Sequence, residues 1–185
     1  MSEASSDRVE IVNIVGAGAL GVEVDIDALA SDIPEAEYDP ENYHGMYLRF
    51  EEHAPLVTLY RSGKYIITGA DSSDGLFEMR EQTLNLLQEM GIVAADVDDG
   101  FSIQNFVCQA DIGQDVNLNA TVIGLGLEKT EYEPEQFPGL VYRPPESDCV
   151  ILLFGSGKVI ITGASELEIA EHAFEHLKSK VAEHL

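Results

Sequence analysis

The sequence predicts an α+β fold built from two tandem copies of one β-α-β-β-β-β-α unit. A twelve-residue segment occurs twice: Leu59–Ala70 reads LYRSGKYIITGA and Leu153–Ala164 reads LFGSGKVIITGA, with nine identical positions at an offset of 94 residues. In both copies, two stretches of apolar alternation flank a Ser-Gly-Lys turn, which is the pattern of a β-hairpin. The elements around each copy also follow in the same order, so the repeat extends over the whole chain.

The first half contains five strand patterns and two helix patterns. Asp25 is placed to cap a short helix, and a longer helix begins at Ser72 and stops at Gly91. The apolar residues of the longer helix gather near one face, namely Phe77, Leu84, Leu87 and Met90. The strands are predicted at residues 9–16, 35–39, 45–50, 55–61 and 65–68.

The second half matches the first element by element. Residues 101–110 form the opening strand, Asn117 caps the short helix, and YEPEQFPGLVYR at 132–143 matches YDPENYHGMYLR at 38–49. The predicted domains are a flexible acidic tail at 1–8, a first repeat at 9–91, a joint at 92–100 and a second repeat at 101–185.

The last helix has its own start signal. Ser165 followed by Glu168 predicts a capping box. The apolar residues behind it recur at spacings of three and four, as one face of a helix requires: Leu167, Ala170, Phe174, Leu177 and Val181.

The composition is strongly acidic. The chain has 34 acidic and 10 basic residues and a formal net charge of −24. Such a charge repels itself, but at ~1 M salt the screening length is only about 3 Å. We interpret this as adaptation to a salt-rich cytoplasm; an acidic protein with basic partners is the alternative. No apolar run approaches the ~20 residues of a membrane span, and the N-terminus does not resemble a secretion signal, so we expect a cytoplasmic location.

Several motifs suggest chemistry that the surrounding sequence does not support. Residues 16–21 read GAGALG, but a dinucleotide site needs a helix to open within that motif, and here the helix cap is Asp25. Residues 96–100 lack calcium-loop spacing and are interpreted as part of the joint. Cys108 and Cys149 are expected to be small buried residues, and the pair His172 and His176 a solvated surface. We therefore expect no enzyme activity, no cofactor and no metal.

The predicted sheet is apolar on both faces. One parity carries Val12, Ile14, Val57, Leu59 and Ile67, which suits a face covered by helices. The other parity is also apolar: Val15, Tyr60, Ile66, Val107, Leu152, Phe154 and Ile160. An antiparallel sheet with one wet face would alternate with polar residues, so the second face predicts a binding surface. Burial against a partner subunit, as in a sheet-mediated homodimer, or against another sheet is the alternative.

Polar residues are duplicated around this second face. Of only ten basic residues, Arg49 and Arg143 are equivalent, as are Lys64 and Lys158, which suggests phosphate contacts. Asn13, Asn105, Thr68 and Thr162 share the parity of the second face. An apolar sheet with bulky side chains and central hydrogen-bonding groups fits the minor groove of DNA, where A·T is mainly distinguished from G·C.

On these residues the sequence resembles an archaeal TATA-box-binding protein of halophilic type, over about residues 9–185. The most specific segments are 132–139, the two Ser-Gly-Lys hairpins, and Ile-Gln-Asn-Phe-Val at 103–107. The resemblance implies a saddle of ten antiparallel strands with four helices on its convex face. It also implies a general initiation factor, monomeric with an internal pseudo-twofold axis, that bends TATA-like promoter DNA. Assembly with transcription factor B, and indirectly RNA polymerase, would follow.

The resemblance also implies roles for individual residues. The wedges between base steps would be Phe137, Phe154, Tyr43 and Tyr60. The base contacts would be Asn13, Val15, Ile66, Thr68, Asn105, Val107, Leu152, Ile160 and Thr162, and the phosphate contacts Arg49, Lys64, Arg143 and Lys158. Transcription factor B would contact Glu133, Glu135 and Gln136; a merely solvated loop is the alternative there.

Two features of the first repeat depart from the family pattern. Tyr43 and Tyr60 stand where the second repeat has phenylalanines, and Thr58 stands where it has Leu152. A tyrosine can insert between bases only if its hydroxyl finds a partner or stays in water. The second half is therefore expected to hold DNA better. A paralogue that acts mainly as a protein-interaction module, with weak DNA binding, remains the alternative.

Overall fold

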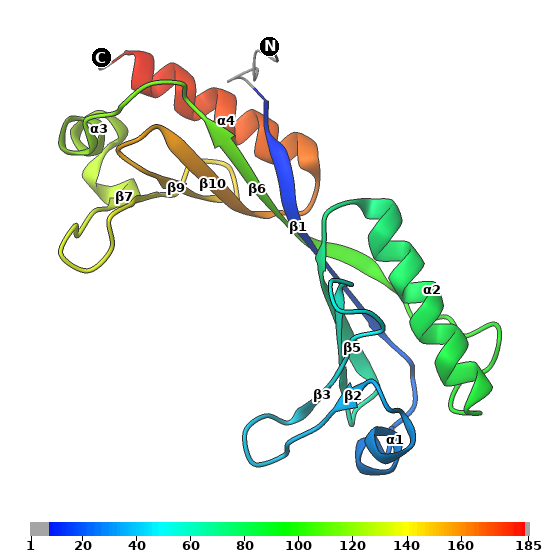
Figure 1. Ribbon diagram of the computed structural model, residues 1–185. Coiled ribbons are helices and arrows are strands. Elements are labelled where there is room, and N and C mark those ends of the chain that lie inside the picture. The colour runs from blue at the N-terminus through cyan, green and yellow to red at the C-terminus, as the bar shows by residue number, and fades with distance from the viewer. Residues whose placement is uncertain (1–7, 184–185) are drawn as a thin grey trace. The chain divides into compact units, whose positions relative to one another are not determined.

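The computed structural model describes residues 8–183, so the predicted acidic tail lies outside the described residues except for Arg8. The order of elements in each half is the predicted one (Figure 1). The first half comprises β1 (Glu10–Ala19), α1 (Ile26–Asp32), β2 (Ala36–Glu37), β3 (Gly45–Leu48), β4 (Leu56–Tyr60), β5 (Lys64–Ala70) and α2 (Ser73–Glu89). The second comprises β6 (Ser102–Asp111), α3 (Leu118–Leu125), a 3-10 turn η1 (Leu127–Lys129), β7 (Thr130–Glu131), β8 (Leu140–Tyr142), β9 (Val150–Leu153), β10 (Lys158–Ala164) and α4 (Leu167–Ala182).

The strands form a ten-stranded sheet in the order β2-β3-β4-β5-β1-β6-β10-β9-β8-β7. The chain divides into two compact units. The first-repeat unit is Asn13–Gln104, and the second-repeat unit runs from Asn105 onward and includes the described residues up to Val12. The order of strands in one repeat mirrors that in the other, as the internal duplication predicts.

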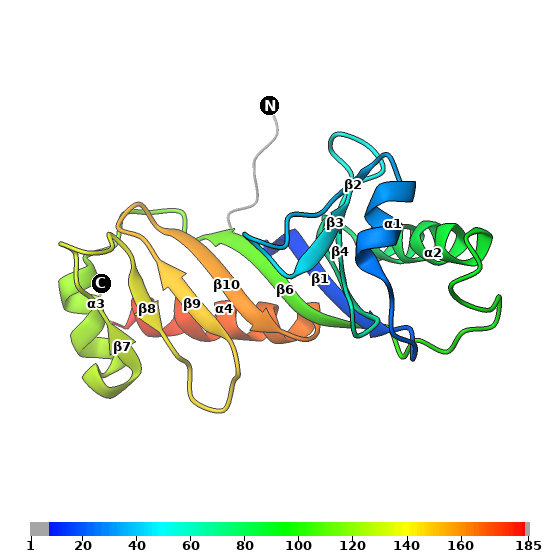
Figure 2. The ribbon, with the colours of Figure 1, turned by 90° about the horizontal axis from the view of Figure 1, so that it is seen from below.

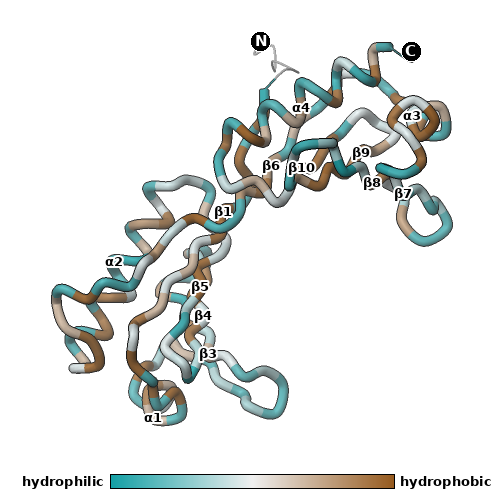
Figure 3. The backbone as a smooth tube through the Cα atoms, turned by 180° about the vertical axis from the view of Figure 1, so that it is seen from behind, coloured by the Kyte–Doolittle hydropathy of each residue, from teal (hydrophilic) through white to brown (hydrophobic). Residues whose placement is uncertain are grey.

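Each unit packs its long helix on one face of its strands. Helix α2 lies beside β5, and α4 lies across the back of β9, β10 and β6 (Figure 2). Hydrophobic and hydrophilic stretches alternate along both helices (Figure 3), as amphipathic helices require. The side chains predicted for the helix-covered face are buried at Ile14, Val57, Leu59 and Ile67.

Two positions of this predicted core are wrong. Val12 is 43% exposed and Phe77 is 40% exposed. Phe77 instead lies edge-on to Phe101, with ring centroids 5.5 Å apart. The buried face of α2 is formed by Leu76, Met79, Thr83, Leu84 and Leu87. Leu84 and Leu87 are thus buried as predicted, whereas Leu76 takes the place of its neighbour Phe77 in the core.

Two helix starts are capped as the sequence predicts, at Asp25 and Asn117, and a third is capped by Ser72, where the sequence predicts that the long helix begins. The Asp25 carboxylate accepts from the Ala28 amide at 3.1 Å, the Asn117 side chain from Ala120 at 3.2 Å, and the Ser72 hydroxyl from Gly75 at 3.1 Å. These side chains satisfy amide groups that have no partner within the helix.

The capping box predicted at Ser165 is wrong. Helix α4 has Glu166 at its N-cap, and that residue makes no side-chain capping hydrogen bond. Glu166 lies 94 residues after Ser72, the cap of α2. The helix therefore starts where the repeat places it, although a better capping residue lies one position earlier.

The two Ser-Gly-Lys segments are hairpin turns. Gly63 has φ +83° and Gly157 has φ +87°, and their amides donate to the carbonyls of Tyr60 and Phe154, both at 2.9 Å. A Cβ at Gly63 would lie 2.0 Å from the Val22 carbonyl oxygen, and one at Gly157 would lie 2.3 Å from that of Gln114. Both backbone conformation and space therefore require glycine in these turns.

The excluded motifs have structural explanations. Gly16 and Gly18 lie within β1 rather than at a helix start, and each faces an aromatic ring, of Phe101 and Tyr65 respectively. Cys108 and Cys149 are free and buried, as predicted, and burial raises the pKa of Cys108 to about 11. In the described part of the chain, no helix is long and apolar enough to cross a membrane.

Candidate nucleic-acid interface

The face away from the long helices is apolar and half-buried in each unit. Val15, Ile66, Val107, Leu152 and Ile160 all have intermediate exposure, while their sequence neighbours on the other parity are buried. Strand pairing places these side chains in rows. In the first-repeat unit one row runs Tyr47, Thr58, Ile66, Ala17, and in the second-repeat unit the equivalent row runs Val141, Leu152, Ile160, Gln109.

The four predicted polar residues form two matched pairs on this face. Asn13 donates its Nδ2 to the Thr68 hydroxyl at 3.3 Å, and its Oδ1 accepts from the Gly69 amide at 2.7 Å. Asn105 makes the same two bonds, to Thr162 at 3.3 Å and from Gly163 at 2.7 Å.

An irregular register in each sheet makes these pairs possible. The pairing of β1 with β5 shifts between Ile14 and Gly16, and that of β10 with β6 shifts between Ile161 and Ala164. A shift of this kind leaves a backbone N–H group without a partner in the sheet, and this N–H group donates a hydrogen bond to the asparagine Oδ1. The amide orientation is thereby fixed, and each asparagine keeps one N–H, beside a threonine hydroxyl, for a ligand.

In the second-repeat unit the predicted wedges form an apolar pair. The rings of Phe137 and Phe154 meet edge to face, with centroids 5.8 Å apart. Both rings lie over Gly139, where a Cβ would come within 2.7 Å of Phe137. Phe137 is 38% exposed, so this pair presents an accessible apolar edge.

In the first-repeat unit the wedge pair is polar. The hydroxyls of Tyr43 and Tyr60 lie 2.6 Å apart and share a hydrogen bond. That hydrogen bond is the main cause, and burial the second, of a rise in the pKa of Tyr60 to about 12. Tyr47 stacks on Tyr43 with centroids 5.3 Å apart, and His44 adds a ring 5.2 Å from Tyr60.

The four predicted phosphate-binding side chains are all exposed. The Arg49 guanidinium donates to the Ala54 carbonyl at 2.6 Å, and Arg143 pairs with Glu131 at 3.2 Å. Lys64 and Lys158 stand directly after the two hairpin turns. Arg143 would have to leave Glu131 to meet a phosphate, which at such exposure costs little.

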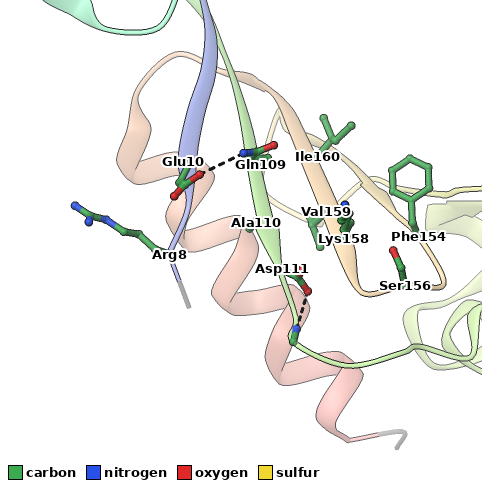
Figure 4. A pocket seen from close by; sticks show the side chains of 11 residues that line it. Arg8, Glu10, Gln109, Ala110, Asp111, Phe154, Ser156, Lys158, Val159 and Ile160 are labelled. Carbon is green, nitrogen blue, oxygen red and sulfur yellow. Dashed lines mark hydrogen bonds between the residues drawn. The ribbon is translucent and has the colours of Figure 1, made fainter. Parts of the chain in front are cut away.

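A hollow of about 660 Å³ in the second-repeat unit brings three of the predicted residues together (Figure 4). Phe154, Lys158 and Ile160 line it, beside Gln109 and Glu10, whose side chains are joined by a 3.2 Å hydrogen bond from Gln109. Gln109 and Glu10 were not predicted for the site. The repeat carried a signal, since Gln109 stands where the first repeat has Ala17 at the offset of 92 residues that relates Asn13 to Asn105.

The predicted partner loop is exposed and has a defined turn. Glu133, Glu135 and Gln136 are all exposed, and the Glu133 carbonyl accepts from the amides of Gln136 and Phe137 at 2.9 and 3.0 Å. The turn places Phe137 directly after the acidic residues. The face and the loop are thus connected by a single backbone segment.

An unpredicted charged group lies in the joint. Asp99 is 5% exposed and binds Arg80 through two hydrogen bonds of 2.6 and 3.0 Å, and it also accepts from the Tyr65 hydroxyl. Burial alone would raise the pKa of Asp99, but the hydrogen bonds from Arg80 and Tyr65 lower it below the usual value. The Asp99 carbonyl also accepts from Ala19 at 2.8 Å, which attaches the joint to β1.

The two helix histidines predicted to be solvated differ in their surroundings. Among residues 8–183 there is no group of three or more side chains that could hold a metal ion. His172 is exposed, as predicted, but the prediction is wrong for His176, which is half-buried and hydrogen-bonded to the Tyr142 hydroxyl at 3.0 Å.

Comparison with known proteins gives consistent results. The family model described as "Transcription factor TFIID (or TATA-binding protein, TBP)" matches residues 8–90 and 100–184. TATA-box-binding protein C of Halobacterium salinarum is 56% identical over 95% of this chain and 98% of its own length. TATA-box-binding protein 2 of Haloferax volcanii is 44% identical over 95% and 94%. The solved structure of Methanococcus jannaschii TBP matches with a TM-score of 0.82 at 38% identity, covering 95% of this chain and 99% of that one.

Proposed function

We propose how this chain, which belongs to the TATA-binding protein family, acts as a general transcription factor on promoter DNA. The observation that carries the proposal is the duplicated half-buried face with an Asn–Thr pair at the same place in each unit. Each unit would contact one half of a TATA-like element through the minor groove. Residues 9–91 and 101–185 would be the two repeats and residues 92–100 their joint.

The centre of the face would read the bases. In the minor groove, A·T and T·A pairs present only acceptors, at adenine N3 and thymine O2. The free N–H of Asn13 or Asn105 and the hydroxyls of Thr68 and Thr162 can donate to them. The apolar neighbours would pack on the groove floor, where the N2 amino group of guanine would be left without a partner: Val15, Ile66, Val107, Leu152 and Ile160.

The ends of the face would bend the DNA. Insertion of an aromatic ring between base pairs unstacks a step and opens the minor groove toward the protein. Phe137 and Phe154 suit this because their edge is accessible and carries no group that needs water. Tyr43 and Tyr60 would insert at the other end. Arg49, Lys64, Arg143 and Lys158 would then meet phosphates, which position the duplex without reading its sequence.

The exposed loop that carries Glu133, Glu135 and Gln136 would bind transcription factor B and, through it, recruit RNA polymerase. Its carboxylates are solvated and free to pair with a basic surface. The protein would bind promoter DNA in an archaeal cytoplasm, and it would act as a monomer with internal pseudo-symmetry. The similarity to haloarchaeal proteins supports a salt-rich interior.

A second candidate function is protein interaction with only weak DNA binding. It is favoured by the net charge of −24 and by the Tyr43 and Tyr60 hydroxyls, which are hydrogen-bonded to each other. The charge opposes DNA binding at low salt, where repulsion of the phosphates is unscreened. The tyrosine pair opposes insertion at any salt concentration, because its polar hydroxyls would leave water.

A DNA titration across salt concentrations separates the two functions. Affinity for a TATA-containing duplex and for a scrambled duplex would be measured from ~0.1 to ~3 M KCl, where the screening length falls below about 3 Å. We expect affinity for the TATA duplex to hold or rise with salt, because screening removes protein–DNA repulsion. Counterion release gives ordinary basic DNA-binding proteins a steep fall, and such a fall would contradict the expectation. Equal, weak binding of both duplexes at all salt concentrations would favour the interaction module.

A further inference from the structure

The two units differ in hydroxyl groups at four equivalent positions. The first-repeat unit has Tyr43, Tyr47, Thr58 and Tyr60, which we name the hydroxyl cluster. At the offset of 94 residues the second-repeat unit has the apolar cluster, Phe137, Val141, Leu152 and Phe154. Every hydroxylated side chain on one side is thus matched by a side chain without a polar atom on the other.

The hydroxyl cluster is contiguous. The Tyr43 and Tyr60 hydroxyls are 2.6 Å apart, and Tyr47 stacks on Tyr43 with an interplanar angle of 2°. Tyr47 and Thr58 are direct cross-strand partners. The Thr58 methyl and the rings of Tyr43 and Tyr60 all meet above Gly45, where a Cβ would come within 3.0 Å of each.

The cluster lies in the proposed DNA face. Thr58 occupies the row of Ile66, and Tyr43 and Tyr60 occupy the places that Phe137 and Phe154 take in the other unit. In the hydrogen-bonded tyrosine pair one hydroxyl donates to the other, so one hydroxyl hydrogen and several lone pairs remain for a ligand. The Tyr60 hydroxyl stays protonated near neutral pH, because the hydrogen bond with Tyr43 raises the pKa of Tyr60.

The chemistry of the minor groove distinguishes these two surfaces. A G·C pair differs from an A·T pair there by the N2 amino group of guanine, a donor. A hydroxyl can accept from that donor or give to N3 and O2, so it suits either pair. A phenylalanine, valine or leucine offers no acceptor, and the buried donor is left unsatisfied.

We propose that the hydroxyl cluster makes the first-repeat unit accept a G·C pair at its end of the element, while the apolar cluster makes the second-repeat unit reject one. This inference rests on the proposed DNA-binding function and adds to it a preferred orientation of the protein on the DNA. The protein binds an element that is A·T at both ends in either orientation. It binds an element with a G·C pair at one end in a single orientation, with the first-repeat unit on that end.

The test uses four duplexes that share a symmetric A·T core. They carry A·T at both ends, G·C at one end, G·C at both ends, or inosine·C at both ends; inosine lacks the N2 amino group. We expect the one-ended G·C duplex to bind within about threefold of the A·T duplex, and the two-ended G·C duplex about tenfold or more weakly. The inosine duplex should recover the affinity of the A·T duplex.

Two matched double variants exchange the chemistry of the ends. Tyr43→Phe with Tyr60→Phe removes only hydroxyls, and should weaken the one-ended G·C duplex about tenfold relative to the A·T duplex bound by the same variant. Phe137→Tyr with Phe154→Tyr adds hydroxyls to the second-repeat unit, and should restore binding of the two-ended G·C duplex. Each variant places in one repeat the residue types that already occupy the same positions of the other, so the fold accommodates them.

Orientation is read directly from DNA cleavage. An iron-EDTA reagent on Glu135→Cys, in the exposed loop of the second-repeat unit, should cut the one-ended G·C duplex only near its A·T end. Cleavage at both ends, or a G·C penalty equal in wild type and in both double variants, would overturn the inference while leaving DNA binding intact. Failure to bind the A·T duplex at any salt concentration would instead overturn the proposed function.

Discussion

At the scale of single residues, Asp99 shows how a charge is buried without an enzymatic purpose. Its carboxylate is held by Arg80 and Tyr65, and the Arg80 guanidinium also lies 5.7 Å from the Phe101 ring centroid. The Tyr65 and Phe101 rings stack with centroids 5.7 Å apart. The Asp99 side chain is 2% exposed while that of Arg80 is 26% exposed, so the ion pair is only partly shielded from water. The ion pair attaches the joint to helix α2 of the first-repeat unit.

Replacement of this carboxylate gives the first prediction. Asp99→Asn should lower the free energy of unfolding by about 2–4 kcal/mol at pH 7, because Arg80 loses its partner while partly buried. The pKa of Asp99 is lowered on folding, so the stabilisation is present above about pH 4 and is lost as the pH falls through the folded-state pKa. Urea unfolding at pH 7 and pH 3 measures both effects. The exposed Asp96→Asn is the control, and an equal midpoint for both variants would contradict the role of the ion pair.

The wedge residues give a second prediction at this scale. Phe154→Ala should weaken DNA binding by about 1–3 kcal/mol, as loss of an aromatic ring stacked on a base does, and should reduce bending. Tyr60→Ala should have a smaller effect, because insertion of Tyr60 takes a polar hydroxyl out of water. Fluorescence energy transfer across the duplex reports the bend. Equal losses in the two variants would remove the asymmetry between the units.

At the scale of elements, the repeat decides where helices begin. Helices α2 and α4 follow equivalent hairpins, and their N-caps, Ser72 and Glu166, are equivalent residues. Only Ser72 bonds a free amide, that of Gly75. Packing of α4 through Phe174 and Leu177, both fully buried, sets its register and outweighs the better cap available at Ser165. Core packing outweighs a local capping motif because a cap stabilises a helix by about 1 kcal/mol, whereas burial of each large apolar side chain stabilises the fold by about 1.5–3 kcal/mol.

The missing cap gives the third prediction. Glu166→Ser should stabilise the protein by about 0.5–1 kcal/mol, because serine can accept an amide of the first turn of α4. Thermal unfolding followed by circular dichroism would measure it. Ser72→Ala, which removes the equivalent cap of α2, should destabilise by a similar amount. If Glu166→Ser left the midpoint unchanged while Ser72→Ala lowered it, the geometry at the start of α4 would not be that of a cap.

At the scale of the whole molecule, charge dominates the response to solvent. Acidic residues exceed basic ones by 24, and many of the few basic groups are committed to ion pairs such as Arg61 with Asp27 and Arg80 with Asp99. The remaining carboxylates repel one another over about 10 Å at 0.1 M salt and over about 3 Å at 1 M. Stability and DNA affinity should therefore change with salt in the same direction.

This gives the fourth prediction. The unfolding temperature should rise from ~0.1 to ~1 M KCl and change less above it, since screening is then nearly complete. Scanning calorimetry at matched pH would show the rise. Replacing the exposed Glu81 of α2 and Glu171 of α4 by glutamine should reduce its slope. A midpoint that falls with KCl, or a slope insensitive to these replacements, would contradict a screening mechanism.

The sequence by itself determined the order of elements, the two hairpins, two of the three predicted helix caps and the family. Strand alternation, glycine turns and capping residues act over a few positions, and the internal duplication states each signal twice. It also predicted that Cys108 and Cys149 are buried and that GAGALG is not a nucleotide site. The roles of individual residues on DNA remain predictions.

Only the tertiary structure decided the contacts that join distant positions. The side-chain amides of Asn13 and Asn105 are oriented by backbone N–H groups that the register shifts leave unpaired in the sheet. These N–H groups lie more than fifty residues away in the chain. The burial of Asp99, the shared hydrogen bond of Tyr43 and Tyr60, and the pairing of Gln109 with Glu10 likewise depend on which strands lie side by side. Periodicity places a side chain on a face, but its hydrogen-bond partner on that face is set by the register between strands.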